Sequence, residues 1–135
     1  MSYLLNTCIV SAFFRKSASL IEKLEKLTPD DIKISTITLM EIEYGLQLNP
    51  PLRSKIQPIW HSLKSQVEII PFSQDDAIHA AHIRSVLKKE GRLIGPYDIL
   101  LAGTSKNHKL IFVTDNVAEF KRIEDLRVEN WIRNH

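Results

Sequence analysis

The chain has few of the features that mark specialised protein classes. Cys8 is the only cysteine among 135 residues, which rules out an intramolecular disulfide and a zinc site with several thiolates. No apolar run approaches the ~20 residues of a membrane-spanning helix, and residues 1–9 lack the basic start and long apolar stretch of a signal peptide. We therefore expect a protein of the reducing cytoplasm without a membrane segment.

Charge and aromatic content are also low. The formal net charge is +2, the aromatic fraction is 7%, and the apolar and charged fractions of 44% and 25% are ordinary for a globular protein. Disordered and fibrous classes are therefore excluded, and any affinity for nucleic acid must come from local clusters of Lys and Arg. The length suits one domain spanning residues 1–135.

Strand-like and helix-like patterns alternate along the chain. The first apolar run, residues 3–5, continues after a polar break into residues 8–10, and a central parallel strand is expected to end at that break. Further strands are expected at residues 32–36, 67–72, 110–113 and 127–129. Helices are expected after residue 17, from 38 to about 48, over 52–63 with a kink or break at Pro58, over 73–90, from 96, and after 116. This order predicts an α/β fold with a mostly parallel sheet covered by helices on both faces.

Polar residues follow several of the apolar runs. They are Asn6, Glu41, Asp98 and the group Asp115, Asn116 and Glu119. In open α/β sheets, ligands bind beyond the carboxyl ends of the strands, so these side chains could converge. Carboxylates gathered in one cleft need a divalent cation, and hard oxygen ligands suit Mg²⁺ or Mn²⁺. Acidic clusters of this kind activate water against phosphodiesters, which is typical of nucleases.

Each of these residues also has a purely structural interpretation. Thr38 and Glu41 have the spacing of a capping box at a helix start. Asp98 falls in a first helical turn, where the macrodipole favours a carboxylate. Asp115 or Asn116 could simply be the N-cap of the following short helix.

The remaining candidates are basic residues, the cysteine and the histidines. Lys88, Lys89 and Arg92 cluster just before residues 95–98 and form either a phosphate-binding rim or a solvated helix face. Cys8 is interpreted as a buried apolar side chain, because its neighbourhood offers neither a helix N-terminus nor a basic partner. The five histidines show no metal-ligand spacing.

Four segments together resemble the VapC-type toxins of the PIN-domain ribonuclease family. Residues 3–9 (YLLNTCI) resemble the opening strand motif, and residues 37–41 (ITLME) with Gly45 resemble the second motif. Residues 91–98 (GRLIGPYD) resemble the third motif, and residues 113–116 (VTDN) with Glu119, followed by Trp131, resemble the fourth motif and the closing strand. The resemblance covers essentially the whole chain.

This resemblance implies a PIN-like fold, endonucleolytic cleavage of RNA with Mg²⁺ or Mn²⁺, a VapB-type antitoxin partner and a homodimer. Glu41 and Asp98 match the second and third acids, and Asn116 or Glu119 supplies the fourth position. Asn6 takes the place of the first metal-binding Asp, which is the one departure. An amide lacks the charge that holds Mg²⁺, so activity should be impaired. The substitution is either deliberate or a natural decay, and the intact remaining motifs favour the former.

Two functions therefore follow from the sequence. In the first, Asp98 and a carboxylate at position 6 bind the metal, Glu41 and the Asn116 region orient it through water, and the activated water attacks RNA. In the second, the chain is an inactive PIN-like module that holds RNA or an antitoxin, and Asn6 is the feature that favours it. A thiol enzyme using Cys8 is the weakest alternative.

Overall fold

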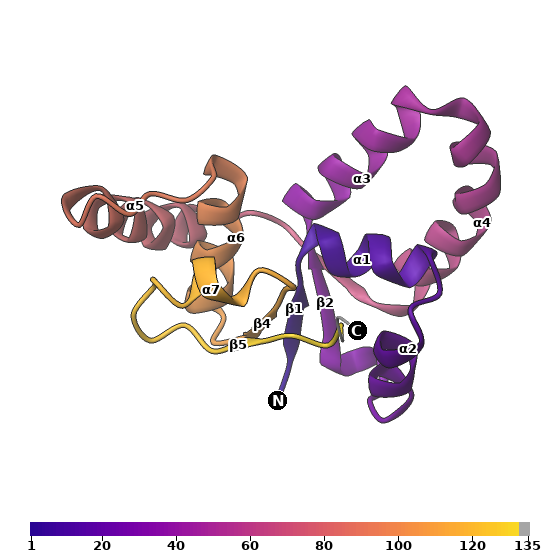
Figure 1. The fold of residues 1–135 in the computed structure, drawn as a ribbon, viewed down its shortest axis with the longest axis horizontal. Helices are drawn as coiled ribbons and strands as arrows, with labels where there is room; N and C mark the ends of the chain where they lie inside the picture. Colours follow the sequence, from indigo (N-terminus) through magenta and orange to yellow (C-terminus); the bar gives the residue numbers. More distant parts are fainter. Residues whose placement is uncertain (133–135) are drawn as a thin grey trace.

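The computed structural model describes residues 1–132 and shows a parallel sheet between two groups of helices (Figure 1). Five strands lie in the order β3-β2-β1-β4-β5, and every neighbouring pair is parallel. The strands are Tyr3–Leu5 (β1), Ile32–Ser35 (β2), Glu68–Ile70 (β3), Ile111–Val113 (β4) and Val128–Glu129 (β5). The predicted mostly parallel α/β sheet is confirmed.

Seven α-helices connect the strands in the described part of the chain. They are Thr7–Phe14 (α1), Ala18–Glu25 (α2), Thr36–Leu48 (α3), Pro50–Gln66 (α4), Gln74–Lys89 (α5), Pro96–Asn107 (α6) and Val117–Phe120 (α7). A short 3₁₀ turn, Pro29–Asp31 (η1), precedes β2. No helix within residues 1–132 is long and apolar enough to cross a membrane.

The two faces of the sheet carry separate hydrophobic cores. Successive side chains of a strand point to opposite faces, so Leu4 packs with α5 and α6 while Leu5 packs with α1 to α4. Phe112 and Val113 divide in the same way. Figure 1 shows α5 and α6 on one side of the sheet and α1 to α4 on the other, as a fully covered parallel sheet requires.

The main difference from the expected elements is α1. Residues 8–10, which continued the first apolar run, form a helix that begins directly after β1. Ile9 and Val10 are both buried in this helix. Two neighbouring apolar residues in a short run resemble a buried strand, although the backbone here is helical. The Asn6 side chain caps this helix by accepting a hydrogen bond from the Thr7 N–H at 2.7 Å.

Two helix boundaries also differ from expectation. α3 begins at Thr36 rather than Thr38, because the Ser35 side chain caps it by accepting from the Ile37 N–H at 3.0 Å. α4 runs from Pro50 to Gln66 with Pro58 inside it, so the expected helix break does not occur. The helix keeps its contacts through buried Ile56 and Trp60, and this packing offsets the lost backbone hydrogen bond.

Candidate active site

The carboxyl ends of the strands bring several predicted residues to one edge of the sheet. β1 and β2 run in the same direction into α1 and α3, which begin side by side (Figure 1). β1 also pairs with β4, so the strand order reverses at β1, between β2 and β4. This reversal is the position where ligands bind in doubly wound sheets. Asn6 follows β1 at this position and Thr114 follows β4.

Asn6 is buried, with 7% of its surface exposed, and both ends of its amide are hydrogen-bonded. Its Oδ1 accepts from the Thr7 N–H, and its Nδ2 donates to Thr114 Oγ1 at 2.9 Å. The Thr114 hydroxyl also accepts from the Asn116 N–H at 3.1 Å. The amide is therefore held between the end of β1 and the end of β4.

Glu41 lies in the second turn of α3 and is not a capping residue. Its Oε1 accepts a hydrogen bond of 2.7 Å from the Thr7 hydroxyl. The capping-box interpretation is wrong, because Thr38 and Glu41 both lie inside the helix that Ser35 caps. Glu41 is therefore joined to the residue that follows Asn6, although 34 positions separate Thr7 from Glu41 in the sequence.

Asp98 is half-buried and lies in the first turn of α6, whose N-cap residue is Gly95. Burial, together with the negative charges of Glu119 and Glu41, raises the pKa of Asp98 from its ordinary value to about 6. The macrodipole of α6 favours the ionised form but does not prevent this shift. Within residues 1–132, Asp98 forms no ion pair.

The fourth position is divided between two residues that contact each other. Asn116 is the N-cap residue of α7, but its side chain does not cap the helix. Its Nδ2 instead donates to Glu119 Oε2. Glu119 in turn lies close enough to Asp98 to affect its pKa. Of these two candidates only Glu119 carries a charge, and the Asn116 amide contacts its carboxylate.

These groups fit a hard divalent cation in chemistry and charge. All of them offer oxygen atoms, which Mg²⁺ and Mn²⁺ prefer, and the three carboxylates Glu41, Asp98 and Glu119 have no cationic partner among the described residues. Glu41 and Glu119 both lie within electrostatic reach of Asp98. They are not gathered at coordination distance, since residues 1–132 contain no group of three or more His, Cys, Asp or Glu side chains that could hold a metal.

Cys8 occupies a helix N-terminus, which the sequence analysis did not expect. It is the second residue of α1, with Sγ 3.8 Å from Thr114 Oγ1. Burial is the largest cause of a rise in the pKa of the thiol to about 11; the Asp115 backbone lowers the pKa, whereas the Asp115 side chain raises it. A thiol in this environment is a poor nucleophile at neutral pH.

Lys88, Lys89 and Arg92 are exposed at the end of α5 and in the turn that follows. Their hydrogen-bonding groups face solvent, and they form no ion pair within residues 1–132. The structure describes no contact between them and the acidic residues, so a role in binding RNA stays a prediction.

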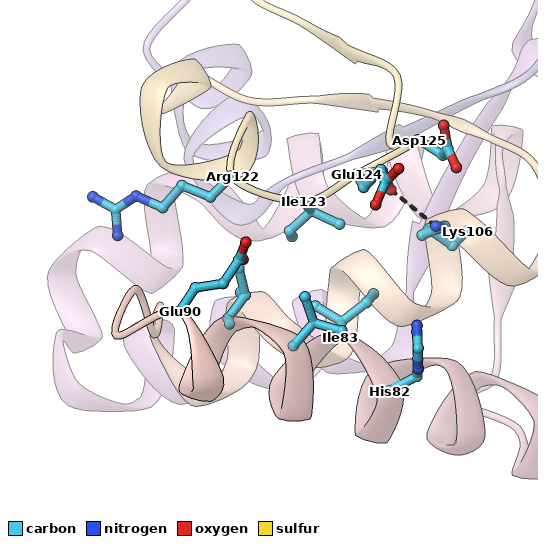
Figure 2. Close-up of a pocket in the computed structure, with 10 residues that line it drawn as sticks. His82, Ile83, Glu90, Lys106, Arg122, Ile123, Glu124 and Asp125 are labelled. Atoms are coloured by element: carbon cyan, nitrogen blue, oxygen red, sulfur yellow. Dashed lines mark hydrogen bonds between the residues drawn. The ribbon is translucent and has the colours of Figure 1, made fainter.

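A separate cavity of about 210 Å³ lies between α5, the last turns of α6 and the segment after α7 (Figure 2). Its walls carry charges of both signs, including Glu90, Lys106 and Arg122, and Lys106 Nζ donates to the Glu124 carbonyl at 2.9 Å. None of the predicted site residues lines it. The cavity is therefore distinct from the acidic edge of the sheet.

Thr7 and Thr114 lie at this edge, and the sequence analysis assigned them no role. Thr114 directly follows an apolar run and Thr7 comes one residue after one, which is the signal that identified their neighbours. Their importance lies in hydrogen bonds that reach across 34 and 108 residues. The sequence alone does not show which distant side chains these hydroxyls contact, because that depends on the order of the strands.

Comparison with known proteins places the chain in a family. The PIN domain model matches residues 3–126. The tRNA(fMet)-specific endonuclease VapC of Salmonella typhimurium is 32% identical over 126 residues, covering 93% of each chain. Ribonuclease VapC2 of Rickettsia felis is 35% identical over 133 residues, covering 97% of this chain and 98% of the relative.

Solved structures agree with this relationship. The crystal structure of VapBC2 from Rickettsia felis bound to a DNA fragment from its promoter contains a chain with a TM-score of 0.88 and 33% identity. The match covers 97% of this chain and 99% of that one. These similarities show that the chain belongs to the PIN-domain family and, within it, to the VapC toxins of toxin–antitoxin systems.

Proposed function

We propose that the acidic edge of the sheet is the active site of a Mg²⁺- or Mn²⁺-dependent endoribonuclease, and that Asn6 impairs it. The observation that supports this most strongly is the environment of Asp98. Glu41 and Glu119 act on it from two other segments and, with burial, raise its pKa to about 6. Acids without a cationic partner whose pKa is perturbed in this way are typical of functional sites.

Asp98 and the side chain at position 6 would hold the metal, with Glu41 and Glu119 placed around them. When bound, Mg²⁺ or Mn²⁺ would activate a water and neutralise charge on the scissile phosphate. Asp98 supplies negative charge at the start of α6, and the Asn116 amide orients Glu119 through its hydrogen bond. Glu41, which accepts a hydrogen bond from the Thr7 hydroxyl, would orient the metal through water.

Asn6 would impair the site because its amide is neutral and already engaged. Oδ1 accepts from the Thr7 N–H, and Nδ2 points a donor, not an acceptor, toward Thr114. A carboxylate at this position would keep the Thr7 hydrogen bond and accept a second one from the Thr114 hydroxyl. It would also add the charge that a hard cation needs.

The remaining roles follow from the family. RNA would be held near the acids by Lys88, Lys89 and Arg92, through contacts to phosphates that carry no sequence information. A VapB-type antitoxin would bind the chain, as the crystallised VapBC complexes of Rickettsia felis and Salmonella typhimurium illustrate for their own toxins. A homodimer is the expected assembly.

The direct test is RNA cleavage by the chain and by its Asn6→Asp variant, each with Mg²⁺, with Mn²⁺ and with a chelator. We expect cleavage by the Asn6→Asp variant only, and its loss when Asp98→Asn is added. Equal cleavage by both chains would show that residue 6 lies outside the metal site. Cleavage that survives the chelator would contradict the metal-dependent mechanism.

The alternative function is a binding module that holds RNA or an antitoxin without cleaving. The engaged amide of Asn6 favours it for the chain as it stands. The two functions differ in the Asn6→Asp variant, because a binding module would stay inactive after the carboxylate is restored. RNA binding without cleavage by both chains would therefore support the binding module.

A further inference from the structure

We propose that Thr7 is a positioning residue that fixes Glu41 relative to residue 6, and this inference rests on the proposed function. Thr7 is the first residue of α1 and directly follows the predicted metal ligand at position 6. Its backbone N–H donates to Asn6 Oδ1 at 2.7 Å, and its hydroxyl donates to Glu41 Oε1 at 2.7 Å. One residue thus contacts both side chains through separate groups.

The hydroxyl is not needed to build the helix on which it lies. Asn6 already caps α1 by accepting from the Thr7 N–H, so the Thr7 side chain has no capping function. A hydroxyl carries a single proton, and the short contact to Glu41 shows where that proton is directed. The fully buried Thr38 hydroxyl is the other acceptor near Thr7 Oγ1, but at 3.4 Å it is much farther away than the Glu41 oxygen.

Glu41 depends on this contact because no cation holds it. On the same helix, Glu43 forms an ion pair with Lys64 at 3.6 Å, whereas Glu41 has no cationic partner within residues 1–132. Glu41 and Asp98 carry like charges within electrostatic reach of each other, and this repulsion would push a free Glu41 carboxylate away from Asp98. The Thr7 hydroxyl opposes this repulsion and keeps one carboxylate oxygen on the side of position 6.

A hydrogen bond that orients a ligand in this way changes metal affinity and turnover together. Partners of metal ligands typically contribute ~10 to 100-fold to affinity or activity. The Thr7 hydroxyl belongs to this class, since it contacts the carboxylate and not the substrate. Its removal should therefore affect metal affinity and kcat but leave the KM for RNA unchanged.

The experiment compares Thr7→Val, Thr7→Ser and Thr36→Val, each in the Asn6→Asp background. Free Mn²⁺ is measured by electron paramagnetic resonance, and kcat and KM are measured at saturating Mn²⁺. We expect Thr7→Val to lose about tenfold in Mn²⁺ affinity and in kcat with KM unchanged, and Thr7→Ser to restore both. Thr36→Val, which removes a hydroxyl that accepts from the Phe72 N–H at 3.1 Å, should lower stability and leave Mn²⁺ affinity intact.

Crystal structures of Thr7→Val and Thr7→Ser in the metal-free parent chain separate this proposal from the proposed function. We expect the Glu41 carboxylate to leave its place in Thr7→Val and to stay in Thr7→Ser, whether or not any variant cleaves RNA. An unmoved Glu41 in Thr7→Val, or Mn²⁺ affinity and kcat within twofold of the Asn6→Asp chain, would overturn the role of Thr7. Inactivity of the Asn6→Asp chain itself would instead count against the nuclease assignment.

Discussion

Asp76 and Asp98 lie on adjacent helices, and the comparison between them separates a structural carboxylate from the proposed metal ligand. Asp76 is in the first turn of α5 and Asp98 is in the first turn of α6, so the macrodipole favours both. Asp76 is completely buried and Asp98 is only half-buried. Even so, the pKa of the buried Asp76 is lowered and that of Asp98 is raised.

The difference arises from the hydrogen-bond donors around each group. Burial alone would raise the pKa of Asp76, but donors from Asn107, Ser73 and Thr104 together outweigh it. Asn107 Nδ2 donates to Oδ1 at 2.7 Å, and the Thr104 hydroxyl donates to Oδ2 at 3.0 Å. Asp98 has acidic neighbours instead. Burial alone therefore does not distinguish the two acids. A carboxylate that lacks donors and cations is the better candidate for a functional acid.

The largest expected effect is at Asp76. Asp76→Ala should lower the free energy of unfolding by about 3 kcal/mol, because it leaves the Thr104 and Asn107 donors without their partner in a buried position. Urea denaturation monitored by circular dichroism measures this. The control is Asp75→Ala, an exposed acid in the same helical turn, for which we expect a loss of at most about 0.5 kcal/mol. Equal losses for both variants would contradict the account.

A substitution at Gly103 tests how closely α5 and α6 must approach each other. A Cβ at this position would lie 2.8 Å from the Ala80 side chain, the Ala80 nitrogen and the Asp76 carbonyl oxygen. Gly103→Ala should therefore lower the free energy of unfolding by about 2 kcal/mol despite the better helix propensity of Ala. The control is Gly45→Ala on α3, where a Cβ would meet nothing within 4 Å and should stabilise the chain. A stabilised Gly103→Ala variant would mean that α5 and α6 pack less tightly.

Asp98→Asn should change the free energy of unfolding in the opposite direction from Asp76→Ala. At pH 7.5 without metal, removal of the repelled charge should raise the free energy of unfolding by about 1 kcal/mol, after allowance for solvent screening of a half-exposed group. Because the folded pKa is raised, the charged form costs stability above about pH 6, and the cost disappears as pH falls from 6 toward the ordinary value of 3.8.

Denaturation of the parent and Asp98→Asn chains at pH 7.5 and pH 4.5 tests this prediction. The difference between them should be smaller at pH 4.5, where Asp98 is protonated in the folded state, and should vanish only below the ordinary value of 3.8, where the unfolded state is protonated as well. An Asp98→Asn chain that is less stable than the parent at pH 7.5 would show that the carboxylate has favourable partners after all. Asp76 behaves oppositely, because its stabilising contribution is lost only as pH falls below 3.8.

A substitution at His108 should change the free energy of unfolding least. Its Nε2 lies 3.2 Å from Asp76 Oδ1, but 41% of the His108 side chain is exposed, and the other donors already satisfy the carboxylate. His108→Gln should therefore change the free energy of unfolding by about 0.5 kcal/mol or less. Thermal denaturation beside Asp76→Ala measures the contrast. A loss as large as that of Asp76→Ala would make His108 an essential partner.

The sequence predicted the strands and most helices because their apolar periods are distinct. It failed at residues 8–10, where a short buried helix follows a strand directly and Ile9 and Val10 show no helical period. Asn6, Glu41, Asp98 and Asn116 were singled out as residues that follow apolar runs or match family motifs. The capping box at Thr38 and Glu41 could be excluded only from the structure, because the Ser35 cap shows that the helix begins earlier.

The most direct test of the central claim is the unfolding temperature of the Asn6→Asp chain as Mn²⁺ is added at pH 7.5. An ion that binds only the folded state raises this temperature. We predict a rise of about 4 °C or more at saturation, reduced to about 1 °C or less when Asp98→Asn is added, since the acids near Asp98 are the proposed site. An equal rise in the chain that carries Asp98→Asn would contradict the account, because the ion would then bind elsewhere.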